Sequence, residues 1–170
     1  MRFAVPGVLL LATAAFTGAQ ETIDAHLAKG EKALLAARGV EGTKALRALE
    51  AAKPHFKRAR ALAAKGLEGA PGAAALEKAH LTATQQLVRI LNAETMIYLG
   101  RGALPLAKKR NGEALKLLPA DARAKALADA IENPAPYEFD ARIVDSLVGG
   151  AQGGKPAARR EADRRFGARR

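Results

Sequence analysis

The chain of 170 residues contains no cysteine and no tryptophan. The absence of cysteine excludes disulfide bonds and zinc sites built on thiolates. Aromatic residues are also scarce, with five phenylalanines and two tyrosines, whereas alanine is abundant. An alanine-rich chain with few aromatic residues favours helices whose backbones approach closely around a thin core. The length is sufficient for one domain.

Catalytic and metal-binding motifs are lacking as well. The three histidines (His26, His55 and His80) are scattered, and none has a second ligand three or four residues away, as a helical metal site requires. We interpret them as surface or half-buried side chains. The glycine-rich segment 69–79 lacks the Lys-Ser/Thr ending of a phosphate-binding loop. The sequence therefore predicts a non-catalytic protein with no cofactor and no metal.

Residues 1–19 are typical of a secretory signal peptide. Arg2 supplies the positive start, a mostly apolar run follows, and small residues just before Gln20 offer a cleavage site. A helix that spans a bilayer needs about 20 apolar residues, so this run is short for a membrane anchor. An uncleaved anchor is the alternative. We expect an exported chain, periplasmic or secreted, that is not an integral membrane protein.

Apolar residues recur every three or four positions, which predicts an all-α fold of antiparallel helical hairpins. The predicted helices span residues 22–38, 43–65, 73–99, 104–118 and 121–131. Gly100 and Gly102 predict a tight reversal between the third and fourth helices, because glycine permits positive φ. The predicted inner face of the fourth helix comprises Leu104, Ala107, Asn111, Ala114, Leu115 and Leu118, whereas Lys108, Lys109, Arg110 and Lys116 mostly face water. Pro54 predicts a kink or a break near residues 51–53, because proline lacks an N–H and clashes with the preceding turn. A glycine-rich linker is expected at residues 66–72. The segment 73–99 carries a wide apolar arc, which indicates a long central helix that is covered on most sides.

The chain divides into three predicted regions: the signal peptide, a helical domain at residues 20–148, and a flexible basic tail at residues 149–170. Within the domain, the apolar residues of 137–148 offer a strip that can dock on the helices. A glycine-rich hinge follows it. The tail has little apolar surface, so we expect it to be disordered in isolation.

Residues 88–121 resemble a tetratricopeptide repeat, a unit of 34 residues made of two packed helices. The residues that match its pattern are Leu91, Thr95, Tyr98, Ala107, Ala114 and Pro119, and Asp121 looks like the N-cap of the next helix. Glu94 stands where the family usually has leucine, and Asn111 where it has a bulky aromatic. A partial second unit near residues 52–64 has Phe56 at that aromatic position. An ordinary helical hairpin is the alternative interpretation.

The resemblance implies a concave groove that binds peptides and is lined by the first helix of each unit. Gln85, Arg89 and Asn92 recur at intervals of four and three residues, so they form one polar stripe on the long helix. Arg89 and Asn92 fall near the positions that would face the groove. Arg89 offers a carboxylate two parallel hydrogen bonds. The alternative is a plain solvated face.

The net charge is +11 and the isoelectric point is about 10.3. Residues 155–170 contain seven basic and two acidic residues, which places close to half of the net charge in the tail. Its arginines are Arg159, Arg160, Arg164, Arg165, Arg169 and Arg170. Each basic residue near an anionic membrane contributes about 1 kcal/mol. The sequence thus predicts an adaptor with a protein or peptide partner. The alternative is a module whose tail binds an anionic polymer or lipid surface.

Overall fold

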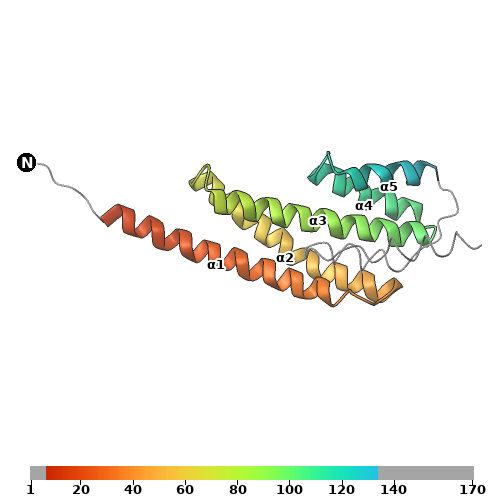
Figure 1. The fold of residues 1–170 in the computed structure, drawn as a ribbon, viewed down its shortest axis with the longest axis horizontal. Coiled ribbons are helices and arrows are strands. Elements are labelled where there is room, and N and C mark those ends of the chain that lie inside the picture. Colours follow the sequence, from red (N-terminus) through yellow and green to blue (C-terminus); the bar gives the residue numbers. More distant parts are fainter. Residues whose placement is uncertain (1–6, 134–170) are drawn as a thin grey trace, which may run out of the picture.

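The computed structural model describes the backbone of residues 7–133 and the side chains of residues 20–133. This part of the chain forms five α-helices and no strand, which confirms the predicted all-α fold (Figure 1). The helices are α1 (Gly7–Leu35), α2 (Gly42–Gly69), α3 (Ala74–Gly100), α4 (Leu104–Leu117) and α5 (Ala122–Glu132). The apolar strip at 137–148 and the basic tail lie outside the described residues.

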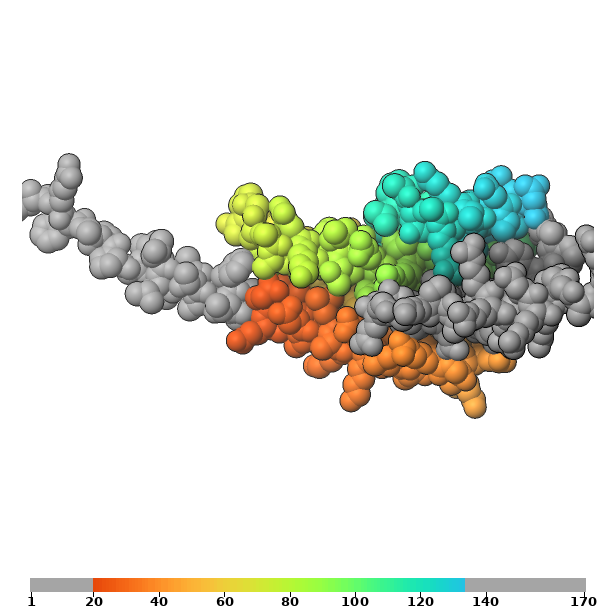
Figure 2. Space-filling model, in the orientation of Figure 1, coloured from red at the N-terminus to blue at the C-terminus, as the bar shows by residue number. Residues whose placement is uncertain are grey.

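Successive helices run in opposite directions and lie side by side, with α3 in the middle (Figure 1). α1 packs along α2, and α2 packs along α3. The shorter helices α4 and α5 cover the C-terminal half of α3. Figure 2 shows the N-terminal half of α3 uncovered beside them. This difference in length leaves open surface on the longer helices.

α1 begins earlier than the helix predicted at residues 22–38, because it also includes residues of the predicted signal peptide. Its N-terminal part projects beyond the other helices (Figure 1). Among the described side chains, Ile23 is the first that is buried. Within the described part of the chain, no helix combines the length and the apolar character needed to cross a membrane.

The reversal between α3 and α4 takes only three residues, Arg101 to Ala103. Gly102 has a φ of 68°, a left-handed conformation that glycine adopts without steric cost. This confirms the glycine-based turn that the sequence predicts here. Pro105 lies in the first turn of α4, where its missing N–H costs nothing.

α2 is continuous through Pro54, so the break that the sequence predicts near residues 51–53 does not occur. Ala52 and Phe56, on either side of the proline, are both 0% exposed. Their burial offsets the local cost of proline, which is about 3 kcal/mol. The linker expected at residues 66–72 is also shorter than predicted, because α2 continues to Gly69.

α3 is the inner helix of the fold, as predicted, because every residue from Ile90 to Ile97 is buried. Small side chains line its contacts with the neighbouring helices. The fully buried alanines on those neighbours are Ala45, Ala52, Ala59 and Ala63 on α2, Ala107 and Ala114 on α4, and Ala124 on α5. A methyl side chain lets two backbones approach closely, so the core is formed by close helix packing and needs few large side chains.

The predicted inner face of α4 is confirmed at Ala107, Asn111 and Ala114, which are buried. Leu104, assigned to the same face, is 36% exposed, because it lies at the first turn of the helix. Arg110 was expected to face water. It is half-buried instead, because its side chain forms an ion pair with Glu94 of α3.

Candidate binding surfaces

Glu94 of α3 is a charged side chain in the protein interior, with 0% of its surface exposed. Lys53 of α2 places its Nζ 2.7 Å from Glu94 Oε1 and donates a hydrogen bond of 3.0 Å to Oε2. Arg110 of α4 places its Nε 3.1 Å from Glu94 Oε2. The guanidinium group of Arg110 also lies 3.2 Å from Glu113. One carboxylate therefore joins three helices.

Burial raises the pKa of Glu94, because desolvation disfavours the carboxylate, while Lys53 and Arg110 act in the opposite direction. Burial alone would lower the pKa of Arg110, but the carboxylates of Glu94 and Glu113 raise it above its ordinary value. A raised carboxyl pKa is also a feature of catalytic acids. With no exposed surface, however, Glu94 cannot reach a substrate. We interpret the Lys53–Glu94–Arg110 cluster as structural, and it accounts for glutamate at a position where the repeat pattern has leucine.

The residues of the predicted polar stripe differ in exposure. Gln85 is exposed, Arg89 is half-buried, and Asn92 is only 2% exposed. The Nδ2 atom of Asn92 donates a hydrogen bond of 3.0 Å to Asp121 Oδ1. The same oxygen accepts a hydrogen bond of 2.7 Å from the backbone N–H of Ala124, which confirms Asp121 as the N-cap of α5. Asn92 thus lies inside the protein, where it ties α3 to the start of α5.

Arg89 lies on α3, one turn before two residues that face different neighbouring helices. Asn92, three residues further on, contacts α5, while Ala93, four residues further on, packs in the core cluster with α1 and α2. Arg123 of α5 is also half-buried, and its Nη2 lies 3.4 Å from Met96 Sδ. Among the described residues, neither arginine forms an ion pair with a carboxylate. We call Gln85, Arg89 and Arg123 the α3–α5 edge.

A cavity of about 320 Å³ opens between α2 and α3 at the point where α4 ends. Its lining residues are Lys57, Arg60, Ala61 and Ala64 of α2, His80 and Leu87 of α3, and Leu117 of α4. No acidic residue is among them. The Nε atom of Arg60 is buried without a hydrogen-bond partner. Burial lowers the pKa of His80, and the charge of Arg60 lowers it further. We call this site the basic cavity.

A second cavity, of about 290 Å³, lies near the turn between α1 and α2. Its lining includes Glu41 and Arg101, which carry opposite charges, together with Ile97. Arg101 reaches across this end of the bundle, where its Nη2 donates a hydrogen bond of 3.2 Å to Thr43 Oγ1. The balanced charges give this cavity no preference for ligands of one sign.

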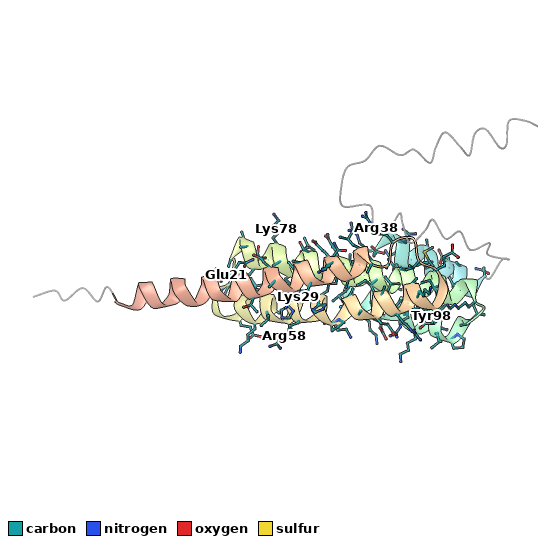
Figure 3. The ribbon with its side chains drawn as sticks, turned by 90° about the horizontal axis from the view of Figure 1, so that it is seen from below. Glu21, Lys29, Arg38, Arg58, Lys78 and Tyr98 are labelled. Atoms are coloured by element: carbon teal, nitrogen blue, oxygen red, sulfur yellow. The ribbon has the colours of Figure 1, made fainter. Side chains whose placement is uncertain are left out.

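The three histidines are half-buried, as expected. Nothing in the sequence indicates, however, that His26 of α1 and His55 of α2 meet, with ring centroids 6.0 Å apart. The pair joins two helices, so local spacing cannot reveal it. Burial lowers the pKa of His26, and the charges of His55, Lys29 and Arg58 lower it further. Figure 3 shows Lys29 and Arg58 on the same side of the molecule. No group of three or more potential metal ligands occurs among the described residues.

Comparisons of the chain with protein-family profiles, with curated protein sequences and with solved structures find no match. The predicted anion-binding arginines of the tail, from Arg159 to Arg170, lie outside the described residues.

Proposed function

We propose that the chain is an exported, non-catalytic helical adaptor that binds a protein or peptide partner at the α3–α5 edge. The observation that carries the proposal is the pair of half-buried arginines, Arg89 and Arg123, which have no carboxylate partner among the described residues. A partly desolvated guanidinium group gains most from a planar carboxylate that accepts two parallel hydrogen bonds. An acidic side chain of a partner would supply that group.

The resemblance to a tetratricopeptide repeat supports the position of this site. The matching residues fall on the C-terminal half of α3, on α4, in the turn that follows α4 and on the N-cap of α5. By the resemblance, α3 and α5 are first helices of successive units, and first helices line the groove that binds a peptide. Gln85, Arg89 and Arg123 then all belong to the groove side.

The position of the core supports export. Cleavage before Gln20 would remove only residues that precede Ile23, the first described side chain that is buried. The remaining α1 would keep its contacts with α2, so the helical stack would survive processing. We therefore propose a periplasmic or secreted location for the processed chain.

Capture of a partner from an exported-protein fraction tests the adaptor function. The variant Arg89→Gln/Arg123→Gln should lose the partner that the unaltered chain retains. Lys78→Gln/Lys125→Gln is the matched control, because it removes the same charge from exposed positions on the same two helices. Capture should also survive high salt and removal of residues 155–170. Equal capture by both double variants would contradict the proposal.

Binding to an anionic polymer or lipid surface is the second candidate, and the charge of α2 favours it. Between Glu50 and Glu68 the chain has no acidic residue but five basic ones: Lys53, Lys57, Arg58, Arg60 and Lys65. Lys53 is already paired with Glu94, so four of the five remain for an anionic ligand. Together with the tail arginines, this segment would attract polyanions. Such binding falls steeply with salt, because it depends on counterion release. Loss of capture both at high salt and on removal of the tail would support this candidate over the adaptor.

A further inference from the structure

The basic cavity exists because α4 is half as long as the helix it covers. α3 has 27 residues and α4 has 14, so α4 ends at Leu117, midway along α3. Beyond this point α4 no longer lies over α2 and α3, which continue side by side with α1 packed against them (Figure 1). Leu117 and Leu87 form an apolar wall at the end of the gap, and the alanines of α2 leave room beside it.

The charges around this gap are all of one sign. Lys57 and Arg60 from α2 and His80 from α3 line it, whereas α4 contributes only an apolar side chain. None of the three basic groups lies within 4.0 Å of a carboxylate among the described residues. The buried Nε–H of Arg60 lacks an acceptor, and leaving such a donor unpaired is unfavourable. An anion in the gap would satisfy this donor and relieve the repulsion between Arg60 and His80.

We propose that the basic cavity binds a small amphiphile with an anionic head group and a short apolar chain. Lys57, Arg60 and His80 would hold the head group, and the chain would lie against Leu87 and Leu117. The volume of about 320 Å³ is near the lower limit for ligand pockets, which suits one short chain. The site shares no residue with the α3–α5 edge, so it adds to the proposed adaptor function and is tested separately.

The head group is defined here by its charge, because carboxylate, phosphate and sulfate offer the same acceptor oxygens. Octyl sulfate is a suitable probe, since it stays anionic across the range in which histidine titrates. Titration calorimetry with the full-length chain, below the micellar concentration, compares it with octyl glucoside and with inorganic sulfate. We expect octyl sulfate to bind at least tenfold more tightly than either compound. Equal binding of octyl glucoside would overturn the proposal, as would equal binding of inorganic sulfate.

Two arginines of α2 provide a matched pair of variants. Arg60→Gln should weaken octyl sulfate binding about tenfold, whereas Arg58→Gln, which removes the same charge outside the cavity lining, should change it less than twofold. Lys57→Gln, at an exposed position, is a second test should Arg60→Gln fail to fold, and it should weaken binding severalfold. Similar losses in Arg58→Gln and in the cavity variants would show non-specific attraction and overturn the proposal.

The proton resonances of the histidine rings give an independent readout. An anion beside His80 favours the imidazolium form, so octyl sulfate should raise the pKa of His80. The charged groups that line the cavity with it are Arg60 and Lys57 of α2. His26 lies outside the cavity lining and serves as an internal control, whose pKa should not move. A pKa of His80 that is unchanged by saturating octyl sulfate would overturn the assignment of this site.

Discussion

Gly30 of α1 lies directly against the ring of Phe56 in α2. A Cβ atom at residue 30 would stand 2.7 Å from Phe56 Cζ, closer than side-chain carbons approach one another. Both residues are buried, and Phe56 belongs to the core cluster shared by α1, α2 and α3. By its low helix propensity alone, this glycine would be expected to destabilise the helix. In the structure it sets how closely α1 approaches α2.

Gly30→Ala should therefore destabilise the protein, although alanine is the better helix former. Overpacking of a well-packed core costs about 1–3 kcal/mol, which exceeds the gain in helix propensity of at most about 1 kcal/mol. Gly112→Ala in α4 is the control, because nothing lies within 4 Å of a Cβ at that position. It should stabilise the protein by about 0.5–1 kcal/mol. Urea unfolding followed by circular dichroism measures both, and a change of the same sign in both variants would contradict this account.

Local signals in the sequence predicted much of the fold. The periodic spacing of apolar residues in 73–99 predicted the bounds of α3 closely. Asp121, which precedes an apolar run, predicted the N-cap of α5. Glycine at position 102 predicted the reversal between α3 and α4. Each of these features depends on residues that are close together in the chain. Helical periodicity and capping chemistry therefore reveal them directly.

Features that depend on contacts between helices were not predictable in this way. Pro54 predicted a kink or a break in α2, and the break does not occur, because burial of residues on both sides keeps the helix continuous. Periodicity placed Asn92 in one stripe with Gln85 and Arg89, yet α5 covers Asn92 and leaves Gln85 exposed. The Lys53–Glu94–Arg110 cluster likewise joins three helices. No spacing along one helix can indicate which neighbour will cover a given position.

Glu94→Ala should be among the most destabilising substitutions in the chain. It leaves Lys53 and Arg110 without their shared carboxylate and opens space in the interior, and breaking a buried ion pair costs about 3–5 kcal/mol. Replacing the whole cluster, as Lys53→Met/Glu94→Leu/Arg110→Met, should cost much less, because apolar side chains need no compensation for lost hydration. Urea unfolding at neutral pH compares the two. A triple variant as unstable as Glu94→Ala would show that the cluster is a net source of stability.

The raised pKa of Glu94 also predicts a pH dependence. Burial raises this pKa above its ordinary value of 4.5, so the folded chain holds the proton more tightly than the unfolded chain does. The contribution of Glu94 to stability is therefore most favourable below pH 4.5 and diminishes as the pH rises through the folded-state pKa. Glu94→Gln places a side chain that does not titrate at this position. Relative to this variant, the unaltered protein should lose stability as the pH rises from the ordinary pKa of glutamate to the folded-state pKa of Glu94. A gain in relative stability with rising pH would contradict the assigned direction.

One oxygen of Asp121 accepts two hydrogen bonds, so substitution of Asp121 should weaken interactions of both α3 and α5. Asp121→Ala removes the N-cap of α5, at about 0.5–2 kcal/mol, and leaves the buried amide of Asn92 without its acceptor, at about 1–3 kcal/mol. Asp121→Asn keeps a side-chain oxygen for the cap and should cost less. A double-mutant cycle with Asn92→Ala measures the coupling, expected to be about 0.5–3 kcal/mol. Additive effects of the two substitutions would show that the Asn92–Asp121 contact contributes nothing.

The partial burial of His26, beside His55, predicts that the protein loses stability in mild acid. Burial and the neighbouring charges of His55, Lys29 and Arg58 lower the pKa of His26 below 6.5, so the unfolded chain binds the proton more readily than the folded chain. Stability should be greatest above pH 6.5 and should fall as the pH drops through the folded-state pKa. His26→Gln should flatten this dependence, measured as the urea midpoint between pH 5 and 8. Lys32→Gln, an exposed charge on the same helix, should leave its slope unchanged. An identical slope in His26→Gln and in the unaltered protein would place the pH dependence elsewhere in the fold.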